Sequence, residues 1–363
     1  MPIPSTITRI SARAIDLPLR ENFTISQGTM TSAANVYVRV ELSDGTVGFG
    51  EAAPFPAITG EDQESTLAAI HGLATLLEDE SALRWRSLAR RMANAAPGNP
   101  AARCAIETAV LDAACRHLGL PMHVLFGGAE TGPFETDITI PIFGQERCLE
   151  LASMWHDRGF RLLKMKIGSD LEADLATIQS IARQFPDVSF VLDANQGFTD
   201  REAIRLVNTL DRARVPVRML EQPIAKGQLK AMMTIRRAAP FQICADESVS
   251  SRFEAMQVIR ADAADIINIK IMKCGVVEAL EIAALARASG IGVMYGGMVE
   301  SRVAMGCSLA LAAGLGSVHT LDLDTPLLLA HDPVEGGFSY DGPRMNVSTE
   351  PGLGCSLDRL FAE

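Results

Sequence analysis

The sequence is short of positive charge. It has 33 lysines and arginines against 44 aspartates and glutamates, which gives a formal net charge of −11. No run of basic residues is longer than a pair such as Arg90-Arg91 or Arg236-Arg237. Proteins that bind nucleic acids usually carry a basic face, so we expect no nucleic-acid partner.

Long apolar runs are missing as well. No stretch reaches the roughly 18 apolar residues that a membrane-spanning helix needs, so we expect no membrane association. The first residues, MPIPSTITRISARAI, contain no apolar segment after a basic start. We therefore expect no secretory signal peptide.

Closely spaced cysteine pairs are also absent. The seven cysteines are scattered along the chain: Cys104, Cys115, Cys148, Cys244, Cys274, Cys307 and Cys355. An odd, dispersed set without a CxxC motif indicates free thiols in a reducing cytoplasm. We expect most of them to be buried as small hydrophobic side chains.

The first third of the chain changes from strand to helix periodicity. The chain has 363 residues, 48% of them hydrophobic, which is typical of two folded domains with a large core. Residues 6–53 alternate around the turn Ser43-Asp44-Gly45 and predict antiparallel strands. Residues 62–118 carry apolar side chains at helical spacing. Strands followed by helices predict an α+β unit.

From about residue 134, short apolar runs alternate with helical stretches. Eight runs share this pattern: TDITIPIF, LLKMKI, VSFVLDA, VRMLEQP, FQICADE, DIINIKI, GVMYGG and HTLDLDTP. Polar markers lie at comparable places in six of them: Lys166, Asp193, Glu221, Asp246, Lys270 and Asp322. The first four intervals between markers are 27, 28, 25 and 24 residues, and the last, 52, spans two units. Such a repeat predicts an α/β fold with a barrel of the (β/α)8 type.

Three carboxylates follow consecutive predicted strands: Asp193, Glu221 and Asp246. The carboxyl ends of barrel strands meet on one face, where barrel enzymes keep their active sites. Clustered anions repel one another unless a cation joins them. Oxygen ligands favour a hard ion such as Mg²⁺ or Mn²⁺ over zinc, and no histidine lies at these strand ends.

Lysines flank the three carboxylates on both sides. Lys164 and Lys166 lie on the second predicted strand, and Lys270 lies on the sixth. Residues two apart on a strand point to the same face, so Lys164 and Lys166 point together into the barrel or out of it. A structural ion pair would explain one buried lysine. Two lysine strands around three acidic strands favour a catalytic site.

These residues lie in motifs that resemble the muconate-lactonising subgroup of the enolase superfamily. The motifs are KMK at 164–166, DANQ at 193–196, EQP at 221–223, ADES at 245–248 and NIKIMKCG at 268–275. The resemblance covers essentially the whole chain and implies a (β/α)7β modified TIM barrel with an N-terminal α+β capping domain. We expect the capping domain over residues 1–125, the barrel over 126–335, and a C-terminal segment, 336–363, that returns to the capping domain.

The resemblance also implies roles for the site residues. It implies one Mg²⁺ per chain, with Mn²⁺ as a substitute, on Asp193, Glu221 and Asp246, and acid/base roles for Lys166 and Lys270. Such sites take a proton from the carbon next to a carboxylate and stabilise the enediolate that forms. Lys164 would add a second positive contact to that anion. We expect neighbouring cations to lower the pKa values of the two acid/base lysines.

The residues at the end of the eighth run indicate which of the reactions known in this subgroup to expect. Asp322 and Asp324, in LDLDTP, resemble the Asp-x-Asp pair by which dipeptide epimerases hold the α-ammonium group. With lysines on opposite faces of the α-carbon, this implies two-base 1,1-proton transfer at the C-terminal residue of a dipeptide. The alternatives are a muconate-type cycloisomerase or an o-succinylbenzoate synthase, in which one lysine cycles its proton, and a catalytically inactive binding module.

Further substrate contacts are expected outside the motifs. Met298 and Glu300 follow the seventh run, and Thr24, Gln27 and Glu51 belong to regions where the capping domain would meet the substrate. We expect the dipeptide to be the small-molecule partner of a homo-oligomer.

The charges of the capping loops bear on the second residue of the dipeptide. Residues 21–30 contain no lysine or arginine, and an unpaired buried carboxylate is strongly disfavoured. We therefore expect an acidic side chain to be a poor fit. Glu51, Glu61 and Asp62 would attract a cationic side chain if they face the site. If they face elsewhere, an apolar side chain is expected.

Overall fold

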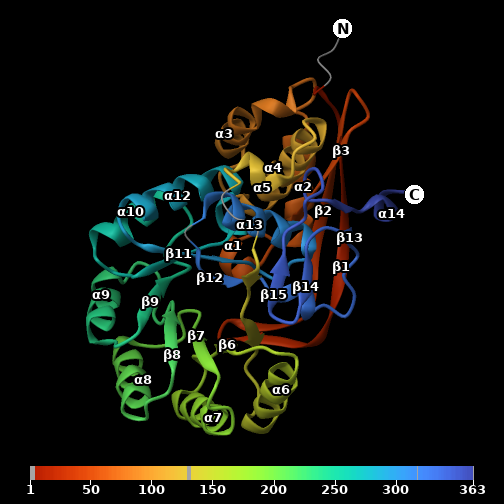
Figure 1. Cartoon of the computed structure of the whole chain (residues 1–363). Coiled ribbons are helices and arrows are strands. Elements are labelled where there is room, and N and C mark those ends of the chain that lie inside the picture. The colour runs from red at the N-terminus through yellow and green to blue at the C-terminus, as the bar shows by residue number, and fades with distance from the viewer. Residues whose placement is uncertain (1–4, 129–131, 317, 363) are drawn as a thin grey trace.

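The computed structural model describes residues 5–128, 132–316 and 318–362. An N-terminal α+β part lies against a barrel (Figure 1). Its antiparallel sheet has the order β1 (Ile7–Ile25), β2 (Gly28–Leu42), β3 (Val47–Ala52). Its helices are α1 (Pro56–Thr59), α2 (Gln63–Ala74), η1 (Ala82–Arg84), α3 (Trp85–Ala95), α4 (Pro100–His117) and α5 (Met122–Leu125). The expected antiparallel strands and following helices are confirmed.

Two glycines let α4 pack closely on β3. A Cβ atom at Gly48 would lie 2.3 Å from a backbone oxygen of α4, and a Cβ atom at Gly50 would lie 1.9 Å from another. The N-terminus of α4 needs acceptors because its first N–H groups have no partner within the helix. The Glu61 carboxylate accepts from Ala101 N at 2.7 Å and from Ala102 N at 3.2 Å. Glu61 is therefore a helix cap.

The barrel is a sheet of eight parallel strands in the described part of the chain, and their order follows the sequence from β5 to β12. The strands are β5 (Ile138–Ile140), β6 (Leu162–Lys166), β7 (Ser189–Asp193), β8 (Val217–Glu221), β9 (Gln242–Ala245), β10 (Ile266–Ile269), β11 (Gly292–Gly296) and β12 (Val318–Asp322). Thr136, just before β5, forms a parallel bridge with Leu321 of β12. All eight predicted runs are strands, and this bridge closes the barrel.

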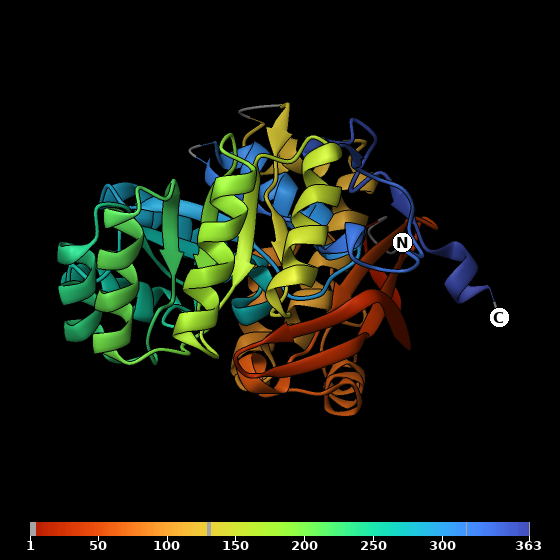
Figure 2. The same cartoon turned by 90° about the horizontal axis from the view of Figure 1, so that it is seen from below.

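Helices cover the outside of the barrel between successive strands (Figure 2). They are α6 (Gln145–Asp157), α7 (Leu171–Gln184), α8 (Asp200–Arg212), α9 (Leu229–Ala238), α10 (Arg252–Arg260), α12 (Val276–Ala288) and α13 (Arg302–Leu315). The single turn α11 (Ile271–Cys274) precedes α12. The (β/α)7β barrel is confirmed.

An apolar layer fills the barrel below its carboxyl face. Its side chains, each with 0% exposure, are Val191, Met219, Cys244, Ile266 and Met294. Asp193, Glu221 and Asp246 come two residues after three of them, and residues two apart on a strand share a face. The carboxylates therefore point into the barrel, above this layer.

The last segment touches both parts of the molecule. Its elements are η2 (Thr325–Leu327), β13 (Glu335–Gly336), β14 (Ser339–Asp341), β15 (Arg344–Asn346), β16 (Cys355–Ser356) and α14 (Asp358–Phe361). β15 pairs with β4 (Phe134–Glu135). Leu353 N donates to Asp112 Oδ1 of α4 at 2.7 Å. Such contacts agree with a return to the N-terminal part, and the domain boundaries after residues 125 and 335 stay a prediction.

The β1–β2 hairpin differs from the expected loop at residues 21–30. β1 continues to Ile25 and β2 begins at Gly28, because Phe23 pairs with Met30 after an irregularity in the register. Only Ser26 and Gln27 form the tip. The hairpin extends from the rest of the sheet towards the barrel strands (Figures 1 and 2).

Two sequence-based expectations concern properties of the whole chain. All seven cysteines are free thiols and buried, as expected. Among the described helices, none has the length and apolar character needed to cross a membrane.

Candidate active site

Charged side chains meet at the carboxyl ends of the barrel strands. Lys166, Asp193 and Glu221 lie opposite one another on β6, β7 and β8. Asp246 and Lys270 directly follow β9 and β10, and all five side chains are buried. The structure thus brings together the residues that the motifs predicted to share one face.

Lys164 contacts three carboxylates. Its Nζ lies 3.1 Å from Asp193 Oδ2, 2.7 Å from Glu221 Oε2 and 2.7 Å from Asp322 Oδ2. Burial lowers the pKa of Lys164, but Asp193 and Asp322 outweigh it and hold this pKa well above its usual range. Lys164 is therefore a permanent cation between β6, β7, β8 and β12.

The two predicted acid/base lysines contact different carboxylates. Lys166 Nζ is 2.6 Å from Asp193 Oδ2, and Lys270 Nζ is 2.7 Å from Asp246 Oδ2. Burial lowers the pKa of Lys270, but Asp246 and Glu221 outweigh it and raise this pKa. The carboxylates thus act against the expected lowering, which counted only the neighbouring cations.

Lys273 is a site residue that the motifs did not predict. Its Nζ donates to Asp246 Oδ1 at 2.5 Å and to the backbone oxygens of Asp246 and Asn268 at 2.6 and 3.2 Å. The single turn α11 carries Lys273 back towards the strand end, three residues after Lys270. That lysine spacing within NIKIMKCG was the available signal.

The three central carboxylates differ in their protonation energetics. Burial raises the pKa of Asp246, but Lys270 and Lys273 outweigh it and lower this pKa well below its usual range. Burial also raises the pKa of Asp193, but Lys164, Lys166 and Lys270 together outweigh it and lower this pKa. Burial raises the pKa of Glu221, whose Oε2 faces the Lys164 ammonium without a directed hydrogen bond. Glu221 Oε2 is thus held by an ion pair with Lys164, while Oε1 accepts from Asn268 Nδ2 at 2.6 Å.

A second acidic group lies beside this cluster. One carboxylate oxygen each of Asp137, Asp322 and Asp324 lies within 4.8 Å of the others. Among the described residues, this is the acidic group whose spacing alone would suit a metal ion. The predicted ligands Asp193, Glu221 and Asp246 do not form such a group among the described residues, and lysine ammonium groups lie against them. Asp137 was not predicted, since it belongs to no motif and precedes its strand.

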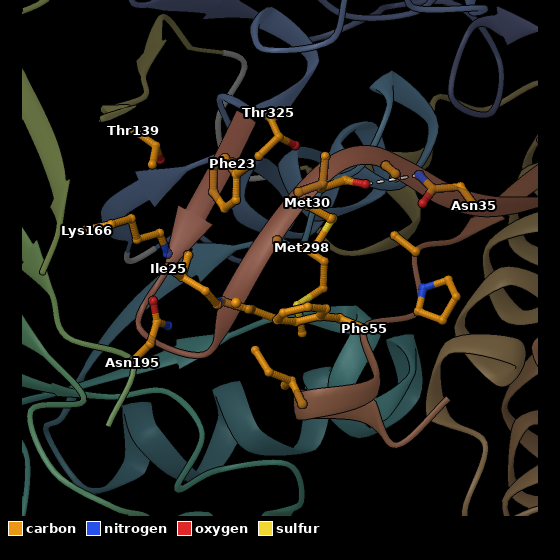
Figure 3. Close-up of a pocket in the computed structure, with 18 of the residues that line it drawn as sticks. Phe23, Ile25, Met30, Asn35, Phe55, Thr139, Lys166, Asn195, Met298 and Thr325 are labelled. Carbon is orange, nitrogen blue, oxygen red and sulfur yellow. Dashed lines mark hydrogen bonds between the residues drawn. The ribbon is translucent and has the colours of Figure 1, made fainter. Parts of the chain in front are cut away.

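The cluster opens into a pocket beneath the β1–β2 hairpin (Figure 3). Its polar lining includes Lys166, Lys270, Thr139, Asn195, Asp322 and Thr325. Its large apolar lining side chains are Phe23, Ile25, Met30, Phe55, Ile58, Met298 and Val299. Figure 3 shows Lys166 and Asn195 on one side of the pocket and Phe55 on the other. The pocket therefore joins a charged end in the barrel to an apolar wall.

Two of the predicted substrate residues near the barrel lie outside the pocket lining. Met298 and Asp322 line it, whereas Asp324 and Glu300 do not. Asp324 is fully buried, and its Oδ2 accepts from Thr139 N at 2.6 Å. Glu300 Oε1 accepts from Met298 N at 2.7 Å, and burial raises the pKa of Glu300 to about 8. Asp324 and Glu300 thus support residues that face the pocket.

Glu51 does not face the pocket, contrary to the expectation for a specificity residue. It lies within β3 and is fully buried. Its carboxylate accepts from Ser301 N at 2.8 Å, Ser301 Oγ at 2.7 Å and Ala304 N at 3.1 Å. The side chain therefore points to the N-terminus of α13, where N–H groups are free to donate.

Thr24 and Gln27 also lie outside the pocket lining. The Thr24 hydroxyl bonds the Thr29 hydroxyl within the hairpin at 3.0 Å. Gln27 Nε2 donates to Asn195 O at 3.0 Å, and Ser26 Oγ bonds the same oxygen at 3.0 Å. These bonds fasten the hairpin tip to the loop after β7, which carries Asn195 in the pocket lining.

The chain matches two family models in succession. Residues 8–127 match the mandelate racemase/muconate lactonizing enzyme N-terminal domain, and residues 147–360 match the enolase C-terminal domain-like family. An aromatic dipeptide epimerase of Herpetosiphon aurantiacus is 40% identical over 356 residues, covering 98% of this chain and 100% of that protein.

Relatives with other substrates show the same extent of similarity. An L-Ala-D/L-Glu epimerase of Bacillus subtilis is 34% identical over 96% of this chain and 96% of that protein. The crystal structure of a dipeptide epimerase from Enterococcus faecalis V583, complexed with Mg and the dipeptide L-Leu-L-Tyr, has a TM-score of 0.93. It is 32% identical and covers 97% of this chain and 99% of that one.

Proposed function

Because this chain belongs to the mandelate racemase/muconate lactonizing enzyme family of the enolase superfamily, we propose that it is an isomerase that epimerises a dipeptide at the α-carbon of its C-terminal residue. The observation that carries the proposal is the pair Lys166 and Lys270. They line one pocket and contact different carboxylates of one site. A relative that covers nearly the whole chain acts on aromatic dipeptides.

The proton transfer requires one lysine as a neutral amine and the other as an ammonium. The neutral amine takes the α-proton, and the electron pair of the broken C–H bond moves into the carboxylate to give an enediolate. The ammonium returns a proton to the same carbon from the opposite face. The first lysine ends as an ammonium and the second as an amine. Lys164 stays charged and stabilises the enediolate.

Asp193, Glu221 and Asp246 are the residues that would hold Mg²⁺. They are buried anions at adjacent strand ends, and Glu221 Oε2 lacks a directed donor among the described residues. When bound, the ion would stabilise the negative charge that develops on the substrate carboxylate. We propose one ion per chain, with Mn²⁺ as a functional substitute because it prefers similar oxygen ligands.

The second acidic group is less suited to a catalytic metal. Within the described residues, no ion pair joins Asp137, Asp322 or Asp324 to Lys166 or Lys270. Lys166 and Lys270 instead contact Asp193 and Asp246, so a substrate carboxylate held at those residues would lie beside both lysines.

Asp322 and Asp324 fit a substrate ammonium group instead. Asp322 lines the pocket, and Asp324 lies behind it as a second anion. Hydrogen bonds between charged partners are stronger than neutral ones, so a cationic substrate end would bind here. Muconate and succinylbenzoate substrates carry no ammonium group and would leave these aspartates without a cationic partner. A cycloisomerase or a succinylbenzoate synthase is therefore only the second candidate.

The apolar wall favours an apolar or aromatic side chain on the second residue. None of the three acids that could have attracted a cation lines the pocket. Glu51 bonds the N-terminus of α13, Glu61 caps α4, and Asp62 caps α2 by accepting from Ser65 N at 2.8 Å. These positions support an apolar rather than a cationic side chain on the second residue.

The function and the preferred side chain of the second residue can be tested by incubating the protein with Mg²⁺ and a panel of dipeptides in deuterated water. We expect deuterium uptake with inversion at the second residue, and kcat/KM at least about tenfold higher for Ala-Phe and Ala-Leu than for Ala-Glu and Ala-Lys, because burying an unpaired charge is unfavourable. Uptake without inversion would favour a one-lysine reaction. No uptake from any dipeptide would reject the proposed activity.

We further propose that the chain forms a homo-oligomer in the cytoplasm. Leu118, Leu120 and Val124 are exposed and follow one another in the sequence between α4 and α5, and exposed apolar side chains often mark interfaces. The free thiols are typical of a reducing compartment.

A further inference from the structure

Three carboxylates lie together where the first and last strands of the barrel meet. Asp137 directly precedes β5, Asp322 ends β12, and Asp324 follows it. Asp137 N donates to Leu321 O at 3.1 Å, which holds the two segments side by side. One oxygen of each carboxylate lies within 4.8 Å of the others. We refer to Asp137, Asp322 and Asp324 as the acidic trio.

Asp137 is the member of the trio with the fewest partners. Its side chain is 0% exposed, and neither of its oxygens accepts a hydrogen bond from a described residue. Asp324 Oδ1 also has no donor in the described chain. Buried polar atoms are nearly always hydrogen-bonded. These oxygens therefore face one another and need hydrogens that the described side chains do not supply.

The trio shares a single cation. Lys164 contacts Asp322, but it also contacts Asp193 and Glu221. The titratable groups that face the trio from neighbouring elements are Lys164 on β6, Glu221 on β8, Glu300 after β11 and Tyr340 on β14. Three buried anions beside one shared cation cannot all remain ionised. A proton is the smallest cation that satisfies the group.

We infer that Asp137 is a positioning residue of the ammonium subsite: the trio shares a proton in the absence of substrate and releases it when the ammonium group of a dipeptide binds. The inference rests on the proposed function, because it requires a substrate with a free α-ammonium group. One carboxyl O–H bond breaks, the proton passes to a buffer base, and ammonium N–H groups become the donors. The net charge of the subsite is unchanged by this exchange.

The energetics of the trio agree with this exchange. Burial, followed by the charges of Asp322 and Asp324, raises the pKa of Asp137 well above its usual range. Burial raises the pKa of Asp324 to about 7. A proton and an ammonium group compete for the same oxygens, so substrate binding weakens as the pH falls through the pKa of the trio and is strongest above it.

Calorimetric titration at pH 6 tests the proton release directly. The Mg²⁺-loaded protein is titrated with an Ala-Phe mixture already equilibrated between its epimers, so that net turnover contributes no heat. Binding enthalpies in two buffers of different ionisation enthalpy give the protons released. We expect about one proton per site from the unmodified protein by linkage. No release from this protein would overturn the inference without any variant.

The variant Asp137→Asn tests whether the released proton comes from the acidic trio or from another buried acid. Replacing one carboxylate by a neutral amide removes the need for the shared proton, so we expect proton release to fall at least about threefold. The substrate ammonium group also loses one nearby negative charge, so KM should rise more than kcat falls. The pH dependence of KM between pH 6 and 7.5 should flatten. Glu107→Gln is the matched control. Glu107 is also buried, and burial raises its pKa to about 7, but its carboxylate accepts from Val277 N at 2.9 Å and does not line the pocket.

The outcomes distinguish the inference from the proposed function. Equal proton release in Asp137→Asn and the unmodified protein would reject the inference, even if both epimerise Ala-Phe. A loss of Mg²⁺ affinity in Asp137→Asn would also reject it, because the trio would then be the metal site. Failure of the unmodified protein to epimerise any dipeptide would reject the proposed function itself.

Discussion

Each buried lysine of the site lies against at least one carboxylate. Lys164 joins three acids, and Lys270 and Lys273 together contact both oxygens of Asp246. Removing one partner of a buried ion pair leaves an uncompensated charge and destabilises the fold. Substitutions here therefore require a stability measurement beside the activity measurement.

Lys166→Ala and Lys270→Ala test the two-base mechanism. General acid and base groups contribute about 10²- to 10⁴-fold to rates, so we expect each variant to lose at least about 10²-fold in epimerisation rate. Each variant should exchange the α-proton of one epimer at most, as measured by NMR in deuterated water. Lys230→Ala, on the exposed face of α9, is the control for the loss of a lysine. Near-normal epimerisation by either site variant would contradict the mechanism.

For single residues, the sequence predicted the site residues that lie in recognisable motifs. It did not predict those that reach the site only through the tertiary fold. Lys166, Asp193 and Glu221 were predictable because strand ends of a barrel share a face. Asp137 was not predictable, because its importance depends on β5 meeting β12, far away in the sequence. Lys273 reaches Asp246 only through the turn of α11.

The hairpin β1–β2 is the element that encloses the pocket. It contributes Phe23, Ile25 and Met30 to the apolar wall. Its tip bonds backbone oxygens of Ala194 and Asn195, directly after the strand that ends in Asp193. A hairpin fastened in this way connects the apolar wall to the charged end of the pocket.

Ser26→Ala combined with Gln27→Ala tests the fastening of the hairpin. These partly buried hydrogen bonds contribute about 0.5–1.5 kcal/mol each, so we expect KM to rise several-fold with a smaller change in kcat. Amide hydrogen exchange in residues 23–30 should become faster. Thr24→Val is the control, since the Thr24 hydroxyl bonds only Thr29 among the described side chains. Unchanged KM and unchanged exchange would show that the tip does not hold the hairpin.

At the element scale, periodicity predicted strands and helices but not the extent of the hairpin. The eight apolar runs of the barrel became β5 to β12, because most residues of these strands are buried. Residues 21–30 lack that apolar continuity and were expected to be a loop. Pairing of Phe23 with Met30 extends the strands instead, and such cross-strand contacts do not appear in a local pattern.

The whole molecule depends on how the N-terminal part is fixed to the barrel. Glu51 of β3 contributes to this joint by accepting from Ser301 and Ala304 at the start of α13. Asn35 Nδ2 donates to Glu51 Oε1 at 2.8 Å and to Val299 O at 3.0 Å, and both Asn35 and Val299 line the pocket. The sequence could assign Glu51 to a strand, but not its partners, which lie about 250 residues later.

Glu51→Gln tests whether this residue joins the two parts or selects the substrate. The amide keeps the shape but removes the charge and one acceptor from a buried set of donors, so we expect a loss of about 1–3 kcal/mol in the free energy of unfolding, measured by urea denaturation. Glu64→Gln, on the exposed face of α2, should change this free energy by less than about 0.5 kcal/mol. The order of kcat/KM among Ala-Phe, Ala-Leu, Ala-Glu and Ala-Lys should stay the same. Unchanged stability with improved use of Ala-Glu would instead make Glu51 a specificity residue, as the sequence first indicated.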